Sequence, residues 1–185
     1  FEGRNELNFH TKSALSSKLS ANVFIHYNER SEEFDKNNDG FLDMPLSEQV
    51  NILSRFQYLD LEKGWVSFFN IRFLQDDKIF GQSDFEPKSH KNKTSVWGSE
   101  IATNRYESSL KIGYVFPDLP YQSFGAQLAY SDHSQESYFG LRKYDIRHKS
   151  GFANLLFNSI LGNTLHKFKI GVQFSFDAYD ELIET

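Results

Sequence analysis

The chain has no cysteine among its 185 residues, and this absence excludes disulfide bonds and thiolate chemistry. It also has no apolar run near the 18 or so residues that a transmembrane helix requires. Its 20 basic and 25 acidic side chains leave a formal net charge of −5, which gives no electrostatic reason to expect a nucleic-acid partner. The sequence contains neither a G-x-S-x-G nucleophile elbow nor an H-E-x-x-H zinc motif. We therefore expect a protein that is not an enzyme.

Aromatic side chains, by contrast, are abundant and make up 16% of the chain. The lipid-facing bands and interfacial girdles of β-barrels need such residues. The mean hydropathy is only −0.54, but a barrel strand alternates between polar and apolar residues, so a low average is expected of it. The composition is thus compatible with a membrane protein built of strands.

The most informative pattern is a two-residue alternation from Leu15 to Asn28, with mostly apolar odd positions and mostly polar even ones. Successive side chains of a strand point to opposite faces, so this segment has one apolar and one polar face. A tilted strand needs about 9–11 residues to cross a bilayer, and this segment is long enough. The pattern favours a membrane-spanning strand.

The same alternation predicts six further strands, over residues 50–58, 65–73, 105–116, 123–130, 154–161 and 167–176. Residues 1–10 could supply an eighth strand. Short turns are expected near Lys12 and at residues 60–64, 117–120 and 162–164. Long polar loops are expected at residues 29–48, 75–100 and 132–150.

Short and long connections take turns along the chain, as do the periplasmic turns and extracellular loops of outer-membrane barrels. A soluble β-sandwich is not expected to sort its loops in this way, although a soluble barrel or sandwich remains the alternative. We predict an all-β fold, the antiparallel wall of a transmembrane β-barrel with about seven or eight long strands. Both chain ends would lie on the long-loop side, and an open sheet with two unpaired edges is not viable in lipid. We therefore expect residues 1–185 to be part of a larger barrel domain.

One predicted loop carries the D-x-N-x-D-G spacing of a calcium loop. The candidate ligands are the side chains of Asp35, Asn37, Asp39 and Asp43 and the carbonyl of Phe41. Hard cations need several oxygens in a tight arc, and the glycine after Asp39 would make the turn. The twelfth position is Leu46 instead of a bidentate glutamate, and the flanks are predicted strands, so the loop is not an EF-hand. The sequence predicts a Ca²⁺ ion that orders an extracellular loop; the alternative is an Asx-rich loop that merely turns.

Polar side chains occupy the other face of the predicted strands. Five charged residues would point into the interior of a barrel: Arg55, Arg72, Arg105, Glu107 and Lys111. One interpretation is a charge network that fills a water-filled interior or contacts a plug. The other is that these residues recognise a substrate. The histidines, His10, His26, His90, His133, His148 and His166, are expected to be solvated or to line that interior. His133 and His148 bracket one predicted loop, where they could touch a metal-bearing ligand.

Aromatic residues near the predicted strand ends fit the interfacial girdles of a barrel better than a platform for stacking bases or sugars. These residues are Tyr27, Tyr58, Trp65, Tyr114, Phe116 and Tyr130. They would mark the two borders of an apolar band.

Six short segments occur in a familiar order along nearly the whole chain. They are H-Y-N-E at residues 26–29, D-G-F-L-D-M-P-L at 39–46, L-E-K-G-W at 61–65, W-G-S-E at 97–100, G-Y-V-F-P at 113–117 and F-S-F-D-A-Y-D-E at 174–181. Together they resemble the barrel region of TonB-dependent outer-membrane receptors, of the ferric-siderophore or vitamin type. Each segment is modest alone, and their order carries the resemblance.

The resemblance implies energised uptake of a scarce ligand, such as a ferric siderophore or cobalamin, across the bacterial outer membrane. The family builds a barrel of about 22 strands around a plug, and the plug and the TonB-contacting box have no counterpart in this sequence. The implied partners are outer-membrane lipid, the remaining barrel and plug, the TonB complex acting through the plug, and a surface lipoprotein. No ligand-binding residue carries over from the family.

Three alternatives stay open on sequence alone. The first is a self-contained small outer-membrane barrel with an adhesive or structural role. The second is a soluble calcium-binding β protein. The last is an enzymatic barrel, which would need a serine and a histidine within hydrogen-bond reach.

Overall fold

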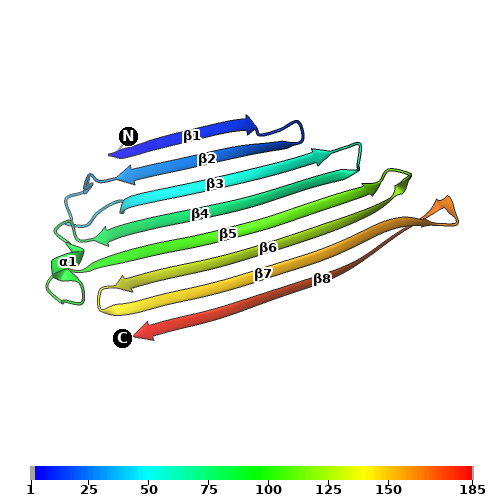
Figure 1. Cartoon of the computed structure of the whole chain (residues 1–185). Helices are drawn as coiled ribbons and strands as arrows, with labels where there is room; N and C mark the ends of the chain where they lie inside the picture. Colours follow the sequence, from blue (N-terminus) through cyan, green and yellow to red (C-terminus); the bar gives the residue numbers. More distant parts are fainter. Residues whose placement is uncertain (1–2, 185) are drawn as a thin grey trace.

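The computed structural model describes residues 3–184, which form one sheet of eight antiparallel strands in sequence order (Figure 1). The strands are β1 (Arg4–Ala14), β2 (Leu19–Arg30), β3 (Leu46–Asp60), β4 (Trp65–Gly81), β5 (Gly98–Phe116), β6 (Leu119–Phe139), β7 (Arg142–Leu161) and β8 (Asn163–Glu184). One short helix, α1 (Pro87–His90), lies between β4 and β5. The prediction of an all-β, antiparallel fold with long strands is confirmed.

The described part of the chain contains no helix long and apolar enough to cross a membrane. The sheet is also open within residues 3–184, because β1 pairs only with β2 and β8 only with β7. Figure 1 shows these two strands at opposite edges of the sheet.

The connections between the strands differ at the two ends of the sheet. Residues 15–18, 61–64 and 117–118 and Gly162 form tight turns at one end, which we call the short-turn end. The β2–β3 connection (residues 31–45) and the β4–β5 connection (residues 82–97, with α1) lie at the other end, which we call the long-loop end (Figure 1). The predicted sorting of short and long connections is therefore present for two of the three predicted loops.

The prediction of a long loop at residues 132–150 is wrong. β6 and β7 continue through this segment in unbroken register, and only Gly140 and Leu141 connect them. Beyond about residue 131 both faces of these strands carry polar side chains, so the alternation that predicts a strand disappears although the backbone ladder continues. The loops predicted at 29–48 and 75–100 are shorter than expected for the same reason.

The first turn also lies elsewhere than predicted. Lys12 is inside β1 and pairs with Asn22, whereas the turn occupies residues 15–18, so the strand predicted from Leu15 begins at Leu19. The hydroxyl of Ser16 accepts hydrogen bonds from the backbone N–H groups of Lys18 and Leu19. The predicted eighth strand exists as β1; Phe1 and Glu2, which were included in it, lie outside the described residues.

Cross-strand register sorts the side chains onto two faces, because directly paired residues share a face. One face carries a continuous apolar band. The band spans Tyr58 to Val50 on β3, Trp65 to Phe73 on β4, Tyr114 to Tyr106 on β5, Phe124 to Tyr130 on β6, Phe157 to Gly151 on β7 and Phe168 to Phe176 on β8. Towards the long-loop end this apolar face turns acidic, with Glu29, Glu48 and Asp77 paired in one row.

The band has no second layer of protein over it. In the described chain Tyr138 is the one large apolar side chain that is buried, while Ile71, Leu128 and Val172 are 47%, 47% and 71% exposed. Soluble sheets bury an apolar face against another layer, and soluble monomers rarely expose an apolar patch beyond a few hundred Å². An apolar face of this extent requires a cover that residues 3–184 do not provide.

Candidate functional site on the polar face

The opposite face of the sheet, which we call the polar face, carries a network of charged and amide side chains. Glu107 on β5 joins two arginines, because its carboxylate lies 3.2 Å from Arg72 on β4 and 2.6 Å from Arg105 on its own strand. Arg72 also donates a 3.0 Å hydrogen bond to Asn51. The sequence predicted that these three charged residues share a face, and the structure brings them together.

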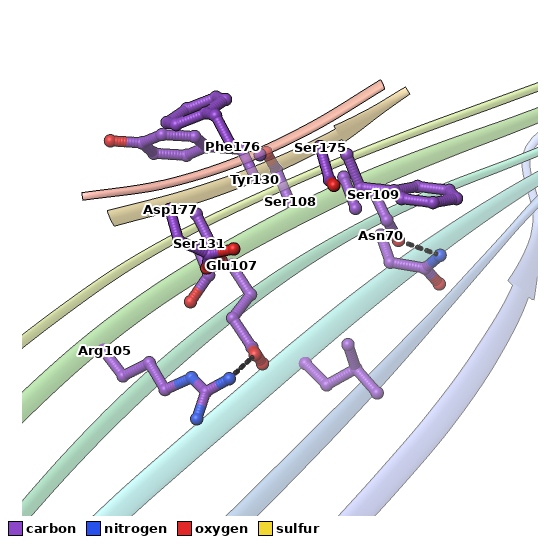
Figure 2. Close-up of a pocket in the computed structure, with 15 residues that line it drawn as sticks. Asn70, Arg105, Glu107, Ser108, Ser109, Tyr130, Ser131, Ser175, Phe176 and Asp177 are labelled. Carbon is purple, nitrogen blue, oxygen red and sulfur yellow. Dashed lines mark hydrogen bonds and ion pairs between the residues drawn. The ribbon is translucent and has the colours of Figure 1, made fainter. Parts of the chain in front are cut away.

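A second chain of hydrogen bonds crosses the same face nearer the short-turn end. Arg55 on β3 donates to Asn70 on β4 at 2.8 Å, and Asn70 donates to Ser109 on β5 at 3.0 Å. Figure 2 shows Asn70 and Ser109 linked in this way, with Arg105 and Glu107 linked beside them. Lys111, the fifth predicted residue, lies on the same face but is opposite Phe68 and Gln127, outside this network.

Part of this network borders a hollow of about 490 Å³ (Figure 2). Arg105, Glu107, Ser131, Ser150 and Asp177 line it, and they come from four consecutive strands, β5 to β8. Strict register brings them together, since Glu107 pairs with Ser131, Ser131 with Ser150, and Ser150 with Asp177. The neighbouring row towards the short-turn end also lines the hollow, with Asn70, Ser109, Ala129, Phe152 and Ser175, so the hollow lies over more than one cross-strand row of the polar face.

The next row towards the long-loop end contains two histidines. His133 on β6 lies between Arg105 and His148, its partners on β5 and β7. The ring of His148 stacks on Tyr179, with centroids 4.1 Å apart, and its Nε2 lies 2.9 Å from Oδ1 of Asp177. The two histidines predicted to bracket a loop are therefore neighbours inside the sheet.

The remaining histidines are dispersed in the structure. His10 stacks on Phe24 with ring centroids 4.1 Å apart, and His26 contacts Asn8 at 2.7 Å. Both belong to the polar face of β1 and β2, whereas His90 lies in α1 and His166 near the short-turn end of β8. None of these four lines the hollow.

Sequence reasoning did not single out Ser131, Ser150 or Asp177 as site residues. In the last strand the odd positions are polar at Lys169, Gln173 and Ser175, and Asp177 continues this series. The alternation could therefore have assigned Asp177 to the polar face. Ser131 and Ser150 stood at the margins of a predicted loop, where no face can be assigned to a side chain.

The predicted calcium loop folds as a chain of Asx turns. Asp35 accepts hydrogen bonds from the N–H groups of Asp39 and Gly40, at 3.2 and 2.8 Å, and Asn37 accepts one from Asp39 at 3.2 Å. Asp39 accepts one from Phe41 at 2.9 Å, and Gly40 has a φ of +81°. The glycine therefore makes the turn, as the motif requires.

The fit of this loop to a cation is partial. Asp35 and Asn37 both direct an oxygen at the backbone of Asp39, so two of the predicted ligands share one small region. Asp43 instead bonds the N–H of Lys36, and Phe41 pairs with Gln82 on the next loop. Within residues 3–184, no three His, Asp or Glu side chains converge closely enough to hold a metal ion. Calcium at Asp35, Asn37, Asp39, Phe41 and Asp43 stays a prediction.

The loops at the long-loop end are tied to one another. Leu42 and Ser83 form backbone hydrogen bonds that connect the β2–β3 and β4–β5 connections, to Gly81 and Gly40 respectively, each at 2.9 Å. The ring of Trp97 lies 6.3 Å from that of Phe41, and on its other side it lies against Gly140, where a Cβ atom would be only 2.8 Å from Nε1. Trp97 therefore links both loops to the β6–β7 turn.

Tyr138 is packed below these loops, well beyond the apolar band. Its side chain is 3% exposed, and the ammonium of Lys91 lies 4.4 Å from its ring centroid. Burial, followed by the charge of nearby Glu100, raises the pKa of Tyr138 to about 12. The phenol is therefore neutral and contributes packing.

The predicted girdle residues all point to the apolar face. Trp65 and Tyr114 pair at the short-turn border of the band, with ring centroids 4.6 Å apart, and Phe116 packs on Tyr114 at 4.8 Å. Tyr58 stands at the same border, whereas Tyr27 and Tyr130 stand towards the opposite one.

Comparison of the chain with family models, with curated proteins and with solved structures finds no match.

Proposed function

We propose that this chain forms part of the wall of an outer-membrane β-barrel, in a TonB-dependent receptor that imports a scarce ligand such as a ferric siderophore or cobalamin. The uncovered apolar band carries the proposal. On β4, β5 and β8 it is about nine residues long, which at about 3.4 Å per residue and a tilt of about 40° corresponds to 20–25 Å. Lipid-facing bands of outer-membrane barrels are about 25 Å tall.

The borders of the band support the same proposal. Trp65 and Tyr114 mark one border, and Tyr27 and Tyr130 approach the other. Tyrosine and tryptophan are the residues that settle at both interfaces of a bilayer. Acidic side chains replace apolar ones beyond the second border, where the strands would leave the lipid for the cell exterior.

The free edges of the sheet favour a larger barrel over a small closed one. β1 and β8 each lack a second neighbour among residues 3–184, and unpaired backbone groups cannot stay exposed in hydrocarbon. In the proposed receptor, further strands pair with these edges. The polar face then lines the interior, where charged residues such as Arg72 and Glu107 meet water and a plug.

The assignment to TonB-dependent receptors is based on the resemblance of the six sequence segments, and the geometry supports the wall itself. Under this proposal the chain is a transporter in the bacterial outer membrane and not an enzyme. Its partners are lipid, the rest of its barrel and plug, the TonB complex, and a surface lipoprotein on the loops. The apolar band disfavours a soluble calcium-binding protein, because water would contact the whole band.

Two neighbouring substitutions in the intact protein test the wall. Ile71→Lys places a charge on the apolar face, and Gln57→Lys places the same charge on the polar face of the neighbouring strand. A lysine at the bilayer midplane of a barrel costs about 2–4 kcal/mol, so Ile71→Lys should reduce the folded, heat-modifiable form in outer-membrane fractions, and Gln57→Lys should not. Equal behaviour of the two variants, or recovery of the protein in the soluble fraction, would contradict the proposal.

Uptake assays test the transport role. Cells with and without the protein are given radiolabelled ferric chelates and cobalamin, before and after a protonophore collapses the proton gradient. The proposal predicts uptake that requires both the protein and the gradient. Uptake that is unchanged by loss of the protein for every ligand would contradict the receptor assignment and leave the wall untouched.

A further inference from the structure

Two nitrogen atoms beside the hollow on the polar face are buried and have no hydrogen-bond partner within the described chain. They are Nε of Arg105 and Nδ1 of His133. Arg105 and His133 are directly opposite each other on β5 and β6, so both nitrogens belong to one small region. A buried polar atom without a partner is costly, and two such atoms in neighbouring residues indicate a hydrogen-bonding partner that the sheet itself does not supply.

Two hydroxyl groups lie in the adjacent row. Ser131 and Ser150 are paired in register and line the hollow. The acids at the two ends of this row are already engaged, Glu107 by two arginines and Asp177 by His148. The groups in the middle of the hollow, the Arg105 guanidinium and the two hydroxyls, can all donate hydrogen bonds, and a ligand rich in acceptors complements them.

The charge of this surface agrees with such a ligand. On β3, β4 and β5 the polar face carries five basic side chains, Arg55, Arg72, Lys78, Arg105 and Lys111, and two acidic ones, Asp76 and Glu107. The chain as a whole has a net charge of −5, whereas the polar face of these three strands has an excess of positive charge. A surface with an excess of positive charge raises the local concentration of anions.

We propose that the hollow lined by Arg105, Ser131 and Ser150, with His133 in the next cross-strand row, binds a small oxyanionic ligand, one that presents carboxylate or phosphate oxygens. Arg105 supplies the charge, and the histidine and the two hydroxyls direct the oxygens. The inference rests on the proposed function, because a ligand from the cell exterior reaches this face only if the face lines the interior of a barrel.

The absence of cysteine allows a direct test in the intact protein. A single Ser150→Cys thiol is treated with two methanethiosulfonate reagents of similar size, one a sulfonate and the other a quaternary ammonium. Ser20→Cys, on the polar face of β2 at the short-turn end, is the matched control. Reagents that differ by two charges report the local potential, and we expect the sulfonate-to-ammonium rate ratio to be about tenfold higher at Ser150→Cys than at the control. Adding Arg105→Gln should abolish most of that difference.

Citrate and inorganic phosphate are the ligand probes. Either anion at millimolar concentration should slow modification of Ser150→Cys and leave Ser20→Cys unchanged. An equal ratio at both sites, or no protection by either anion, would overturn the oxyanion site. If the thiol reacts in detergent but not in intact cells, the polar face does not line an accessible interior, and the proposed function is contradicted as well. If the thiol is unreactive in both, protein fills the hollow, and the proposal that the hollow binds an oxyanion is contradicted.

Discussion

The ammonium of Lys18 lies 2.7 Å from Oδ2 of Asp60 and connects two neighbouring turns at the short-turn end of the sheet. The Asp60 side chain is 2% exposed and also accepts hydrogen bonds from the Tyr58 hydroxyl and the Lys63 backbone. The backbone N–H of Leu59 reinforces the connection by donating to the carbonyl of Lys18 at 2.8 Å. These contacts hold the β1–β2 and β3–β4 turns in register outside the apolar band.

This ion pair predicts a pH window for stability. The hydrogen bond from Lys18 lowers the pKa of the Asp60 carboxyl and raises the pKa of the Lys18 ammonium. Ionised Asp60 stabilises the fold at pH values above the ordinary carboxyl pKa, and this stabilisation is lost as the pH falls through the lowered pKa of Asp60. The stabilisation from the Lys18 ammonium is lost only as the pH rises through the raised pKa of Lys18. Asp60→Asn should therefore lower the melting temperature at neutral pH and show a smaller further loss in acid than the parent. Thermal unfolding in detergent between pH 3 and pH 8 measures this, and parallel curves for parent and variant would contradict it.

Gly151 and Phe176 provide a packing prediction. They are paired on the apolar face of β7 and β8, and a Cβ atom on Gly151 would collide with the Phe176 ring. Gly151→Ala should destabilise the protein by about 1–3 kcal/mol, as overpacking does, and adding Phe176→Ala should restore part of the loss. Urea unfolding in lipid vesicles measures both variants. Additive destabilisation in the double variant would contradict the contact.

Trp97 predicts coupled loop stability. It lies between Phe41 and Gly140, so Trp97→Ala should loosen both connections at the long-loop end. Limited proteolysis of intact cells should then cut within residues 31–45 as well as 82–97. Leu141→Ala, at a side chain that is 53% exposed, is the control and should leave the pattern unchanged. Cleavage confined to residues 82–97 would show that the loops move independently.

Removal of calcium is predicted to loosen the β2–β3 connection. If Asp35, Asn37 and Asp39 hold Ca²⁺, chelation with EGTA should increase protease cleavage within residues 31–45, and Asp35→Asn should mimic chelation. Asp84→Asn, on the neighbouring loop, is the control. An intact loop in the presence of chelator would favour the Asx-turn network alone, since hydrogen bonds to Asp39 and Gly40 already order it.

The sequence predicted the sheet best where its two faces differ. Alternation located the apolar stretches of β3 to β8 and assigned faces to residues such as Arg72 and Glu107, because one face must be apolar there. It failed beyond the band, where His133 and His148 lie on strands that are polar on both faces. Ladder hydrogen bonds continue through these segments without any hydropathy signal, and Ser131 and Ser150 beside the hollow were missed for that reason.

Local turn chemistry was harder to predict than strand identity. The first hairpin turn is set by Ser16 and by backbone bonds to Leu19, and neither depends on the apolar pattern. The connection at Gly140 is two residues long because Gly140 has a φ of +64° and packs against Trp97. That contact joins residues far apart in the sequence, which no local pattern records.

Solvent accessibility along one strand tests the central claim most directly. Single cysteines at Asn70, Ile71, Arg72 and Phe73 in the intact, membrane-embedded protein are labelled with a nitroxide, and collisions with oxygen and with a water-soluble nickel complex are compared by electron paramagnetic resonance. The account predicts a two-residue period, with Ile71 and Phe73 exposed to oxygen in lipid and Asn70 and Arg72 exposed to nickel. Equal exposure of all four positions to the nickel complex would contradict a wall in the membrane.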